Sequence, residues 1–389
     1  MGRTLVPSHP ITHRLMFQFS FPEVTNTYYF TGLGIIVAAY SVYLIISTDD
    51  RQPGDHHRSS MLIPILMAAF LTMWIGNRDP TLGIYGDSYN YNLIYNNVQT
   101  DETSLTSLPD FSSEWLWAAI MYICRLSDLD VNGWFTVIAF LYTFSAVWAA
   151  GVCCPRRPTL ATLLIFASFS FLPFGLNGLR NGVACHMVIL AIAYYLDDRR
   201  IIAGVLAFLI LGIHRSSILP ITAAIAAVTV LKNPRHALYI WIASIPVSLL
   251  LGNTLTAMIM NLGFDDRMVQ YGGSSLSGDN KFSYTGFRWD FLIYGAIPIV
   301  FYWYITFIKG VRDGWYNVIA ITYMLSNAFW IIVIRSTFSN RFAYLSWFLM
   351  PIMIAYPLSE MRFVDKRDTL AALILPLYLV LSVILLIGL

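Results

Sequence analysis

Runs of apolar residues follow one another along almost the whole chain, with short polar breaks between them. A bilayer core takes about 20 apolar residues per helix, so this succession predicts helices that cross a membrane. Only 12% of the 389 residues are charged, whereas a soluble domain carries about 25%. So little charge could not cover a water-facing surface. We therefore predict an all-α, polytopic integral membrane protein, with residues 1–389 forming a single transmembrane domain.

Twelve apolar runs are predicted to cross the membrane, although several are shorter than the usual span. The predicted spans are Tyr28–Ser47, Met61–Gly76, Gly133–Val152, Leu160–Phe174, Gly182–Leu196, Ile201–Ile213, Ser217–Leu231, Ala237–Met260, Phe291–Ile308, Trp315–Ile334, Phe342–Leu358 and Leu370–Leu389. The shortest, Ile201–Ile213, needs helical flanks or a thin bilayer to cross. The segment Leu5–Pro22 is not apolar enough to span, and the string "HRLMFQFSF" at His13–Phe21 is expected to lie at the membrane interface.

Positive charge predicts which helix ends face the cytoplasm, because cytoplasmic loops carry an excess of Lys and Arg. Six short loops with paired basic residues fall on one side of the twelve spans, which we assign to the cytoplasm. These loops contain Arg51, Arg58, Arg156, Arg157, Arg199, Arg200, Lys232, Arg235, Lys309, Arg312, Arg362, Lys366 and Arg367. The aromatic segment Ser113–Cys124 must then be a re-entrant or surface helix. If it crossed the membrane, the loop that contains Arg51 and Arg58 would lie outside the cytoplasm.

On the other side, ionisable residues occur in short strings with Gly, Asn, Ser and Tyr. Two long polar stretches, residues 77–132 and 261–290, are expected to form extracytoplasmic loops that contribute to an active-site cavity. A single Arg at the membrane boundary is often a snorkelling anchor. Several ionisable residues on one face, beside helix-breaking Gly and Asn, are better explained by a functional site.

Arginines that face an outer cavity suit an anion with two or more phosphates, because the guanidinium fork binds phosphate bidentately and stays charged. Arg180 is the first candidate for a diphosphate. It is expected to open a helix, so that helix N-terminal amides and the guanidinium both face the anion. Arg288 and Arg341 are the further candidates, and each could instead be an anchor.

Three residues are candidate general bases, because a carboxylate or His in a partly desolvated site can be tuned towards neutral pH. Asp87 could alternatively cap a helix or form an Asx-turn after Gly86. Glu114 could alternatively lie in the first turn of a helix. His214, which follows the shortest span, could be a hydrogen-bonded structural residue.

Aromatic residues of the outer strings can stack on sugar faces, although any one of them could belong to the aromatic belt of the membrane interface. The candidates for sugar or acceptor binding are Tyr89, Tyr91, Asp290 and Tyr344. The Asp128–Asp130 pair could hold a divalent cation with substrate phosphates, or could be a solvated loop before a helix. We favour arginine alone as the electrophilic partner, and thus predict no metal and no cofactor.

The same strings resemble the EpsG-like and Wzy-like bacterial polysaccharide polymerases. The resemblance lies in "GDSYNY" at Gly86–Tyr91 and in Glu114 of the next segment. It continues in "LRNGVA" at Leu179–Ala184, "HRSS" at His214–Ser217, "FRWDF" at Phe287–Phe291 and "NRFAY" at Asn340–Tyr344. Asn181 stands where this family commonly has Gln, which keeps the amide but shortens its reach.

The resemblance implies a membrane glycosyltransferase of GT-C-like fold that works without a metal at the periplasmic face of the bacterial inner membrane. Such an enzyme joins oligosaccharide repeat units carried on undecaprenyl diphosphate into O-antigen or exopolysaccharide. Its expected partners are these lipid-linked oligosaccharides, membrane lipid and a chain-length regulator protein. Nucleic acid is not expected, because the net charge is only +2 and no Lys/Arg-rich run occurs.

Two alternative functions fit parts of the same pattern. An O-antigen ligase would use the same donor and the same face with a different acceptor. A transporter or flippase for a lipid-linked sugar would place ionisable groups near the bilayer midplane, often in repeated halves. Here the charges gather at one face and no repeat is visible, which favours the polymerase.

Overall fold

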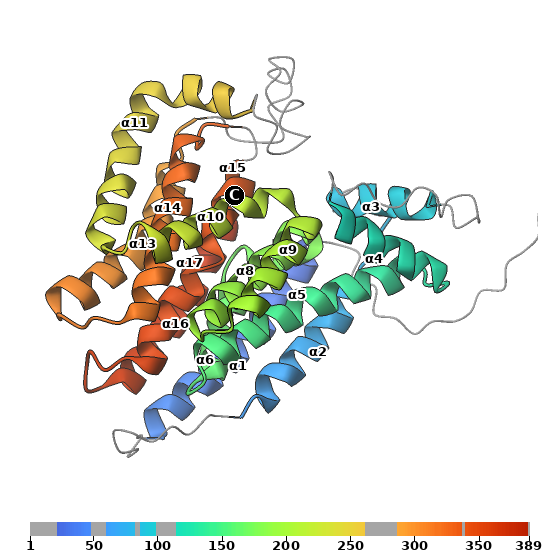
Figure 1. Ribbon diagram of the computed structural model, residues 1–389. Coiled ribbons are helices and arrows are strands. Elements are labelled where there is room, and N and C mark those ends of the chain that lie inside the picture. The colour runs from blue at the N-terminus through green and yellow to red at the C-terminus, as the bar shows by residue number, and fades with distance from the viewer. Residues whose placement is uncertain are drawn as a thin grey trace, which may run out of the picture.

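The chain folds into a bundle of helices (Figure 1), and the computed structural model describes residues 22–47, 60–81, 86–98, 114–260, 286–336 and 339–387. Within these ranges the regular elements are all helices, with no strand. Seven helical stretches are long and apolar enough to cross a membrane: Asn26–Ile46, Val131–Cys153, Leu179–Leu196, Pro234–Gly252, Trp289–Ile308, Ser339–Glu360 and Arg367–Leu386. The prediction of an all-α polytopic membrane protein is thereby confirmed, while the number of twelve crossings stays a prediction.

The bounds of the elements follow the apolar runs closely. The first half contains α1 (Pro22–Ile46), α2 (Leu62–Gly76), α3 (Asp87–Asn96), α4 (Trp115–Leu126), α5 (Val131–Cys153), α6 (Pro158–Ala167), α7 (Phe171–Leu176) and α8 (Leu179–Leu196). The second half contains α9 (Arg200–Ile213), η3 (Arg215–Ser217), α10 (Ile218–Thr229), α11 (Pro234–Met260), α13 (Trp289–Trp303), η5 (Tyr304–Ile308), α14 (Gly314–Ile332), α15 (Ser339–Trp347), α16 (Met350–Glu360) and α17 (Arg367–Ile387).

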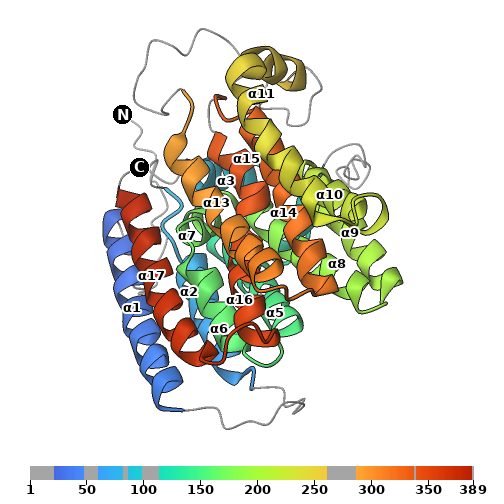
Figure 2. The same cartoon turned by 90° about the vertical axis from the view of Figure 1, so that its left-hand side faces the viewer.

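The centre of the bundle is formed by two short helices, α6 and α16. Every residue of α6 except Thr159 is buried, and so is every residue of α16 except Glu360. The helices α5 and α17 pack against α6, and α14 packs against α16. On the periphery α1 lies along α17 (Figure 2), and α2 lies along α5. The longer outer helices therefore shield the two short central helices from lipid.

Two predicted spans are divided in the structure, and a third begins earlier than predicted. Leu160–Phe174 separates into α6 and α7, because Ser168 takes an extended conformation after the end of α6. Phe342–Leu358 separates into α15 and α16 at a turn formed by Phe348 and Leu349, where Leu349 keeps helical backbone angles. The span Gly182–Leu196 is continuous within α8, which begins earlier than predicted, at Leu179. Most of the predicted interfacial segment Leu5–Pro22 lies outside the described residues.

Two of the basic loops meet at one end of the bundle. The backbone N–H of Arg156 donates to Glu360 Oε1 over 3.1 Å, and Arg157 forms an ion pair with Asp368. The loop after α5 therefore lies beside the loop between α16 and α17. This contact agrees with the prediction that Arg156, Arg157 and the basic residues near 362–367 share one side.

The opposite end carries α3 and α4, which occupy part of the predicted loop 77–132 (Figure 1). The Tyr95 hydroxyl of α3 donates to the Leu129 carbonyl, 2.7 Å away, just before α5 begins. The 23 residues of α5 rise about 34 Å, which separates this end from Arg156. The twelve residues of α4 rise only about 18 Å, too little for a crossing. Their length suits the predicted re-entrant or surface helix.

The two ends of α5 should respond differently to a membrane-impermeant maleimide in intact cells, because the basic end is predicted to be cytoplasmic. The four native cysteines are buried, so the background should be low. We expect Ser127→Cys, in the exposed turn after α4, to be labelled after outer-membrane permeabilisation alone. Lys366→Cys, in the exposed loop before α17, should be labelled only after the inner membrane is opened. The reverse pattern would contradict the orientation.

Candidate active site

Glu114, which directly precedes α4, contacts two other predicted site residues, Arg180 and His214. One of its carboxylate oxygens, Oε2, pairs with the guanidinium of Arg180. The other, Oε1, lies 2.7 Å from His214 Nδ1 and accepts the backbone N–H of Arg215 at 3.3 Å. Only 16% of the Glu114 side chain is exposed. A carboxylate this buried needs such partners to stay charged.

Local geometry brings these three residues together from distant parts of the sequence. Glu114 is the N-cap of α4, but its side chain makes no capping bond and turns to α8 and α9 instead. Arg180 is the second residue of α8, as predicted from the helix start. His214 ends α9 in an extended conformation, which directs its ring away from the helix axis and towards Glu114.

A glycine lets α4 approach α9 closely enough for the contact between Glu114 and His214. A Cβ atom at Gly212 would lie 2.7 Å from the indole of Trp115 and 2.9 Å from Leu116 Cβ. Real Cβ atoms do not approach other atoms so closely, so a side chain at Gly212 would push the start of α4 outwards. Glycine is therefore needed two residues before His214 for a steric reason.

A second ion pair lies beside the first. Both carboxylate oxygens of Asp87 accept from Arg341 Nη2, at 3.2 and 3.3 Å. The amide of Asn181 donates to the Arg341 carbonyl over 3.2 Å. Asn181 directly follows Arg180 in α8, so the two ion pairs are neighbours across the start of that helix. Asn181 thus makes a contact in spite of its short side chain.

The position of Asp87 depends on Arg78, a residue that sequence reasoning did not select. Arg78 is buried just after α2, with its guanidinium 3.7 Å from the centre of the Phe135 ring. Its Nε donates to Ser88 Oγ over 3.0 Å, and its Nη1 donates to the Ile75 carbonyl over 2.8 Å. Since Ser88 is the second residue of α3, Arg78 fixes the start of that helix. In the sequence Arg78 resembles an ordinary polar residue after an apolar run.

Four helix N-termini converge on this cluster. Asp87 begins α3, Glu114 precedes α4, Arg180 is near the start of α8, and Arg341 is the third residue of α15. Each helix start carries a partial positive charge and unpaired amides, which favour an anion. With two arginines among them, the cluster can stabilise more negative charge than its two carboxylates supply.

The predicted residues Arg288 and Asp290 form a separate pair with each other at the start of α13. Arg288 binds both oxygens of Asp290, at 2.9 and 2.5 Å, and stacks on the Phe291 ring at 3.7 Å. The contacts of Glu114 and Asp87 described above involve other residues. Their roles in substrate binding stay predictions.

The three predicted tyrosines differ in exposure. Tyr89 on α3 is 38% exposed and can contact a sugar. Tyr91 is buried against Trp117 and Trp134, and the Arg180 guanidinium lies 5.8 Å from its ring centre. Tyr344 is 1% exposed and stacks on Phe174 with ring centres 3.6 Å apart. In this conformation the rings of Tyr91 and Tyr344 pack against other aromatic rings and offer no open face to a sugar.

The Asp128–Asp130 pair is explained in part by helix capping. Asp130 Oδ1 accepts the backbone N–H of Gly133 over 2.8 Å and is the N-cap of α5. Among the residues that the structure describes, no group of three or more His, Cys, Asp or Glu side chains could hold a metal ion. Whether the protein works without a metal stays a prediction.

Sequence comparison adds one finding. The family-wide sequence model of the EpsG family matches residues 62–388, which is more than half of the chain and includes every residue of the two ion pairs. The match confirms the resemblance seen in the sequence strings. No curated protein and no solved structure matches the chain.

The close contact at Gly212 can be tested by adding one methyl group. We expect Gly212→Ala to lower the stability of the purified protein by about 1–3 kcal/mol, the usual cost of overpacking. Gly204→Ala is the matched control, because it lies in the same helix and a Cβ there meets nothing within 4 Å. Thermal unfolding in detergent measures both. An equal melting temperature for the two variants would contradict the steric role of Gly212.

Proposed function

Because the chain belongs to the EpsG family, we propose that it joins oligosaccharide repeat units carried on undecaprenyl diphosphate into a polysaccharide. Family membership supports a role of the polysaccharide-polymerase kind and an enzyme of the glycosyltransferase type. The donor, the acceptor and the periplasmic face of the bacterial inner membrane are parts of our proposal. The product would be O-antigen or exopolysaccharide.

The observation that carries this proposal is the convergence of Arg180, Arg341 and four helix N-termini at one end of the bundle. A diphosphate leaving group gains negative charge as the bond to the sugar breaks. Positive groups fixed beforehand around that position lower the barrier, because they need no rearrangement during the reaction. The two guanidinium groups would exchange part of their contacts with Glu114 and Asp87 for the diphosphate oxygens.

His214 is the best-placed base. An ionised Glu114 can only accept a hydrogen bond, so the 2.7 Å contact requires the proton of a neutral His214 to be on Nδ1. The basic lone pair is then on Nε2. In the proposed step Nε2 takes the proton of an acceptor hydroxyl, whose oxygen forms a bond to the anomeric carbon of the donor sugar. The bond between that carbon and the diphosphate oxygen breaks, and the lipid diphosphate leaves.

Glu114 is a positioning residue in this scheme. Its two oxygens already have three partners, Arg180, His214 and the Arg215 backbone. It would hold the imidazole in one tautomer and stabilise the imidazolium that forms on proton transfer. Asp87 would orient the guanidinium of Arg341, because both of its carboxylate oxygens accept from Arg341 Nη2.

Removing the Arg180 guanidinium should cost activity without unfolding the protein. We expect Arg180→Ala to reduce the rate of chain elongation by about 100-fold or more, because it removes one charged donor to the leaving group. Purified protein with labelled lipid-linked repeat units, resolved by length on a gel, measures this rate. The control is Arg200→Ala, which removes a 70% exposed side chain at the start of α9. Full-length polymer from Arg180→Ala at normal protein level would contradict its role.

The base and its positioning residue should be separable by kinetics. His214→Gln should lower kcat by about 100-fold to 10,000-fold, the usual contribution of a general base, with little change in KM. Glu114→Gln keeps the shape of the side chain but removes its charge. This variant should lower kcat less and change the pH dependence of kcat, because the negative charge beside the imidazole is lost. Identical pH profiles for Glu114→Gln and wild type would exclude the positioning role.

A further inference from the structure

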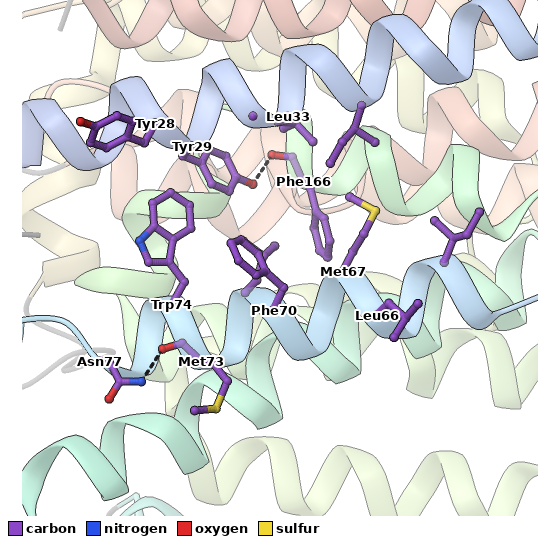
Figure 3. A pocket seen from close by; sticks show the side chains of 14 residues that line it. Tyr28, Tyr29, Leu33, Leu66, Met67, Phe70, Met73, Trp74, Asn77 and Phe166 are labelled. Carbon is purple, nitrogen blue, oxygen red and sulfur yellow. Dashed lines mark hydrogen bonds between the residues drawn. The ribbon is translucent and has the colours of Figure 1, made fainter. Parts of the chain in front are cut away.

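A long apolar groove lies between α1 and α2, outside the cluster of charged residues. Figure 3 shows side chains that line the groove. The volume of the groove is about 1150 Å³. The walls are formed by Leu33 of α1 and by Met67, Phe70 and Trp74 of α2, and Phe166 of α6 lies at its floor. None of the described residues that line it is charged. Pockets for drug-sized molecules are about 300–1,000 Å³, so this groove suits a larger, uncharged chain.

The groove exists because its two walls pack on different partners. The helix α1 lies along α17, while α2 lies along α5, and α6 contacts both α1 and α2. The Tyr29 hydroxyl donates to the Phe166 carbonyl over 2.7 Å, and the Tyr29 ring stacks on Trp74 with centres 5.7 Å apart. The Tyr29 hydroxyl is thus satisfied within the protein, and the lining is mostly apolar, which suits an apolar occupant.

One end of the groove leads to the candidate active site. The lining residues of α2 run from Ile63 to Asn77, which corresponds to about 21 Å of helix. The residue after Asn77 is Arg78, whose Nε donates to Ser88 Oγ over 3.0 Å. Ser88 follows Asp87, the partner of Arg341. The groove therefore ends at the residue that fixes the start of α3 beside the second ion pair.

We propose that this groove holds the isoprenoid chain of a lipid diphosphate while the diphosphate lies at Arg180 and Arg341. The inference rests on the proposed function, because that function supplies a substrate with a charged head and one long apolar tail. An isoprenoid chain is uncharged along its whole length, and the groove is apolar from Ile63 to its end at Asn77. The groove opens between two peripheral helices, so a chain can enter sideways from the bilayer.

A bulky side chain placed in the groove tests this proposal. A Cβ at Gly32 meets nothing within 4 Å, so Gly32→Phe fills the groove without displacing the protein. Leu66→Trp fills it from the opposite wall. The control is Gly204→Phe, which adds the same side chain at an equally open helix glycine outside the groove. Binding of labelled undecaprenyl diphosphate to purified protein in detergent is measured for each variant, with phosphatidylglycerol as competitor.

We expect both filled variants to bind undecaprenyl diphosphate at least about tenfold more weakly than wild type, equivalent to about 1.4 kcal/mol. Gly204→Phe should bind like wild type, and phosphatidylglycerol should compete poorly. Unchanged binding in both filled variants would overturn the groove assignment, while the proposed function would stand if Arg180→Ala still weakens binding. Equal competition by phosphatidylglycerol would make the groove a general lipid site and also overturn the assignment. Wild-type protein that binds no undecaprenyl diphosphate would overturn both proposals.

Discussion

The contact of one carboxylate, Glu114, with Arg180 and His214 organises the candidate site. A partly buried carboxylate at a membrane boundary loses hydration, and it stays charged only beside positive groups or hydrogen-bond donors. The partners of Glu114 are Arg180 of α8 and His214 at the end of α9. The same requirement explains why Gly212 must be small, because α4 cannot otherwise approach α9. The site and the local packing are therefore two results of one electrostatic constraint.

The two ion pairs of the candidate site are each formed by one carboxylate and one guanidinium, and positive helix ends lie around them. Asp87 and Glu114 offset Arg341 and Arg180, while the starts of α3, α4, α8 and α15 add partial positive charge. Such a site can receive an anion by exchanging carboxylate contacts for phosphate contacts. The neighbouring apolar groove supplies the complementary environment for a tail. A head group and a tail would then be bound by adjoining parts of the fold that differ completely in polarity.

The apolar pattern of the sequence predicts most helices well, since lipid requires long apolar stretches with internally satisfied backbones. Gly133–Val152 corresponds to α5, and Arg180 lies at the predicted helix start. Hydropathy does not detect the breaks after α6 and α15, because the residues at those breaks stay buried. Hydropathy also predicts a loop where α3 lies, because that helix is polar and its start is fixed by the hydrogen bond from Arg78 to Ser88. The pairing of Glu114 with His214 joins residues 100 positions apart, and no local pattern contains that information.

The proposed function requires the end of the bundle that contains Glu114 to bind a lipid diphosphate through arginine. A cryo-electron microscopy structure of the protein in lipid nanodiscs with undecaprenyl diphosphate tests it most directly. We expect phosphate oxygens within hydrogen-bond distance of the guanidinium groups of Arg180 and Arg341, near the start of α8. Density for the diphosphate at the opposite end, beside Arg156 and Arg157, would contradict it.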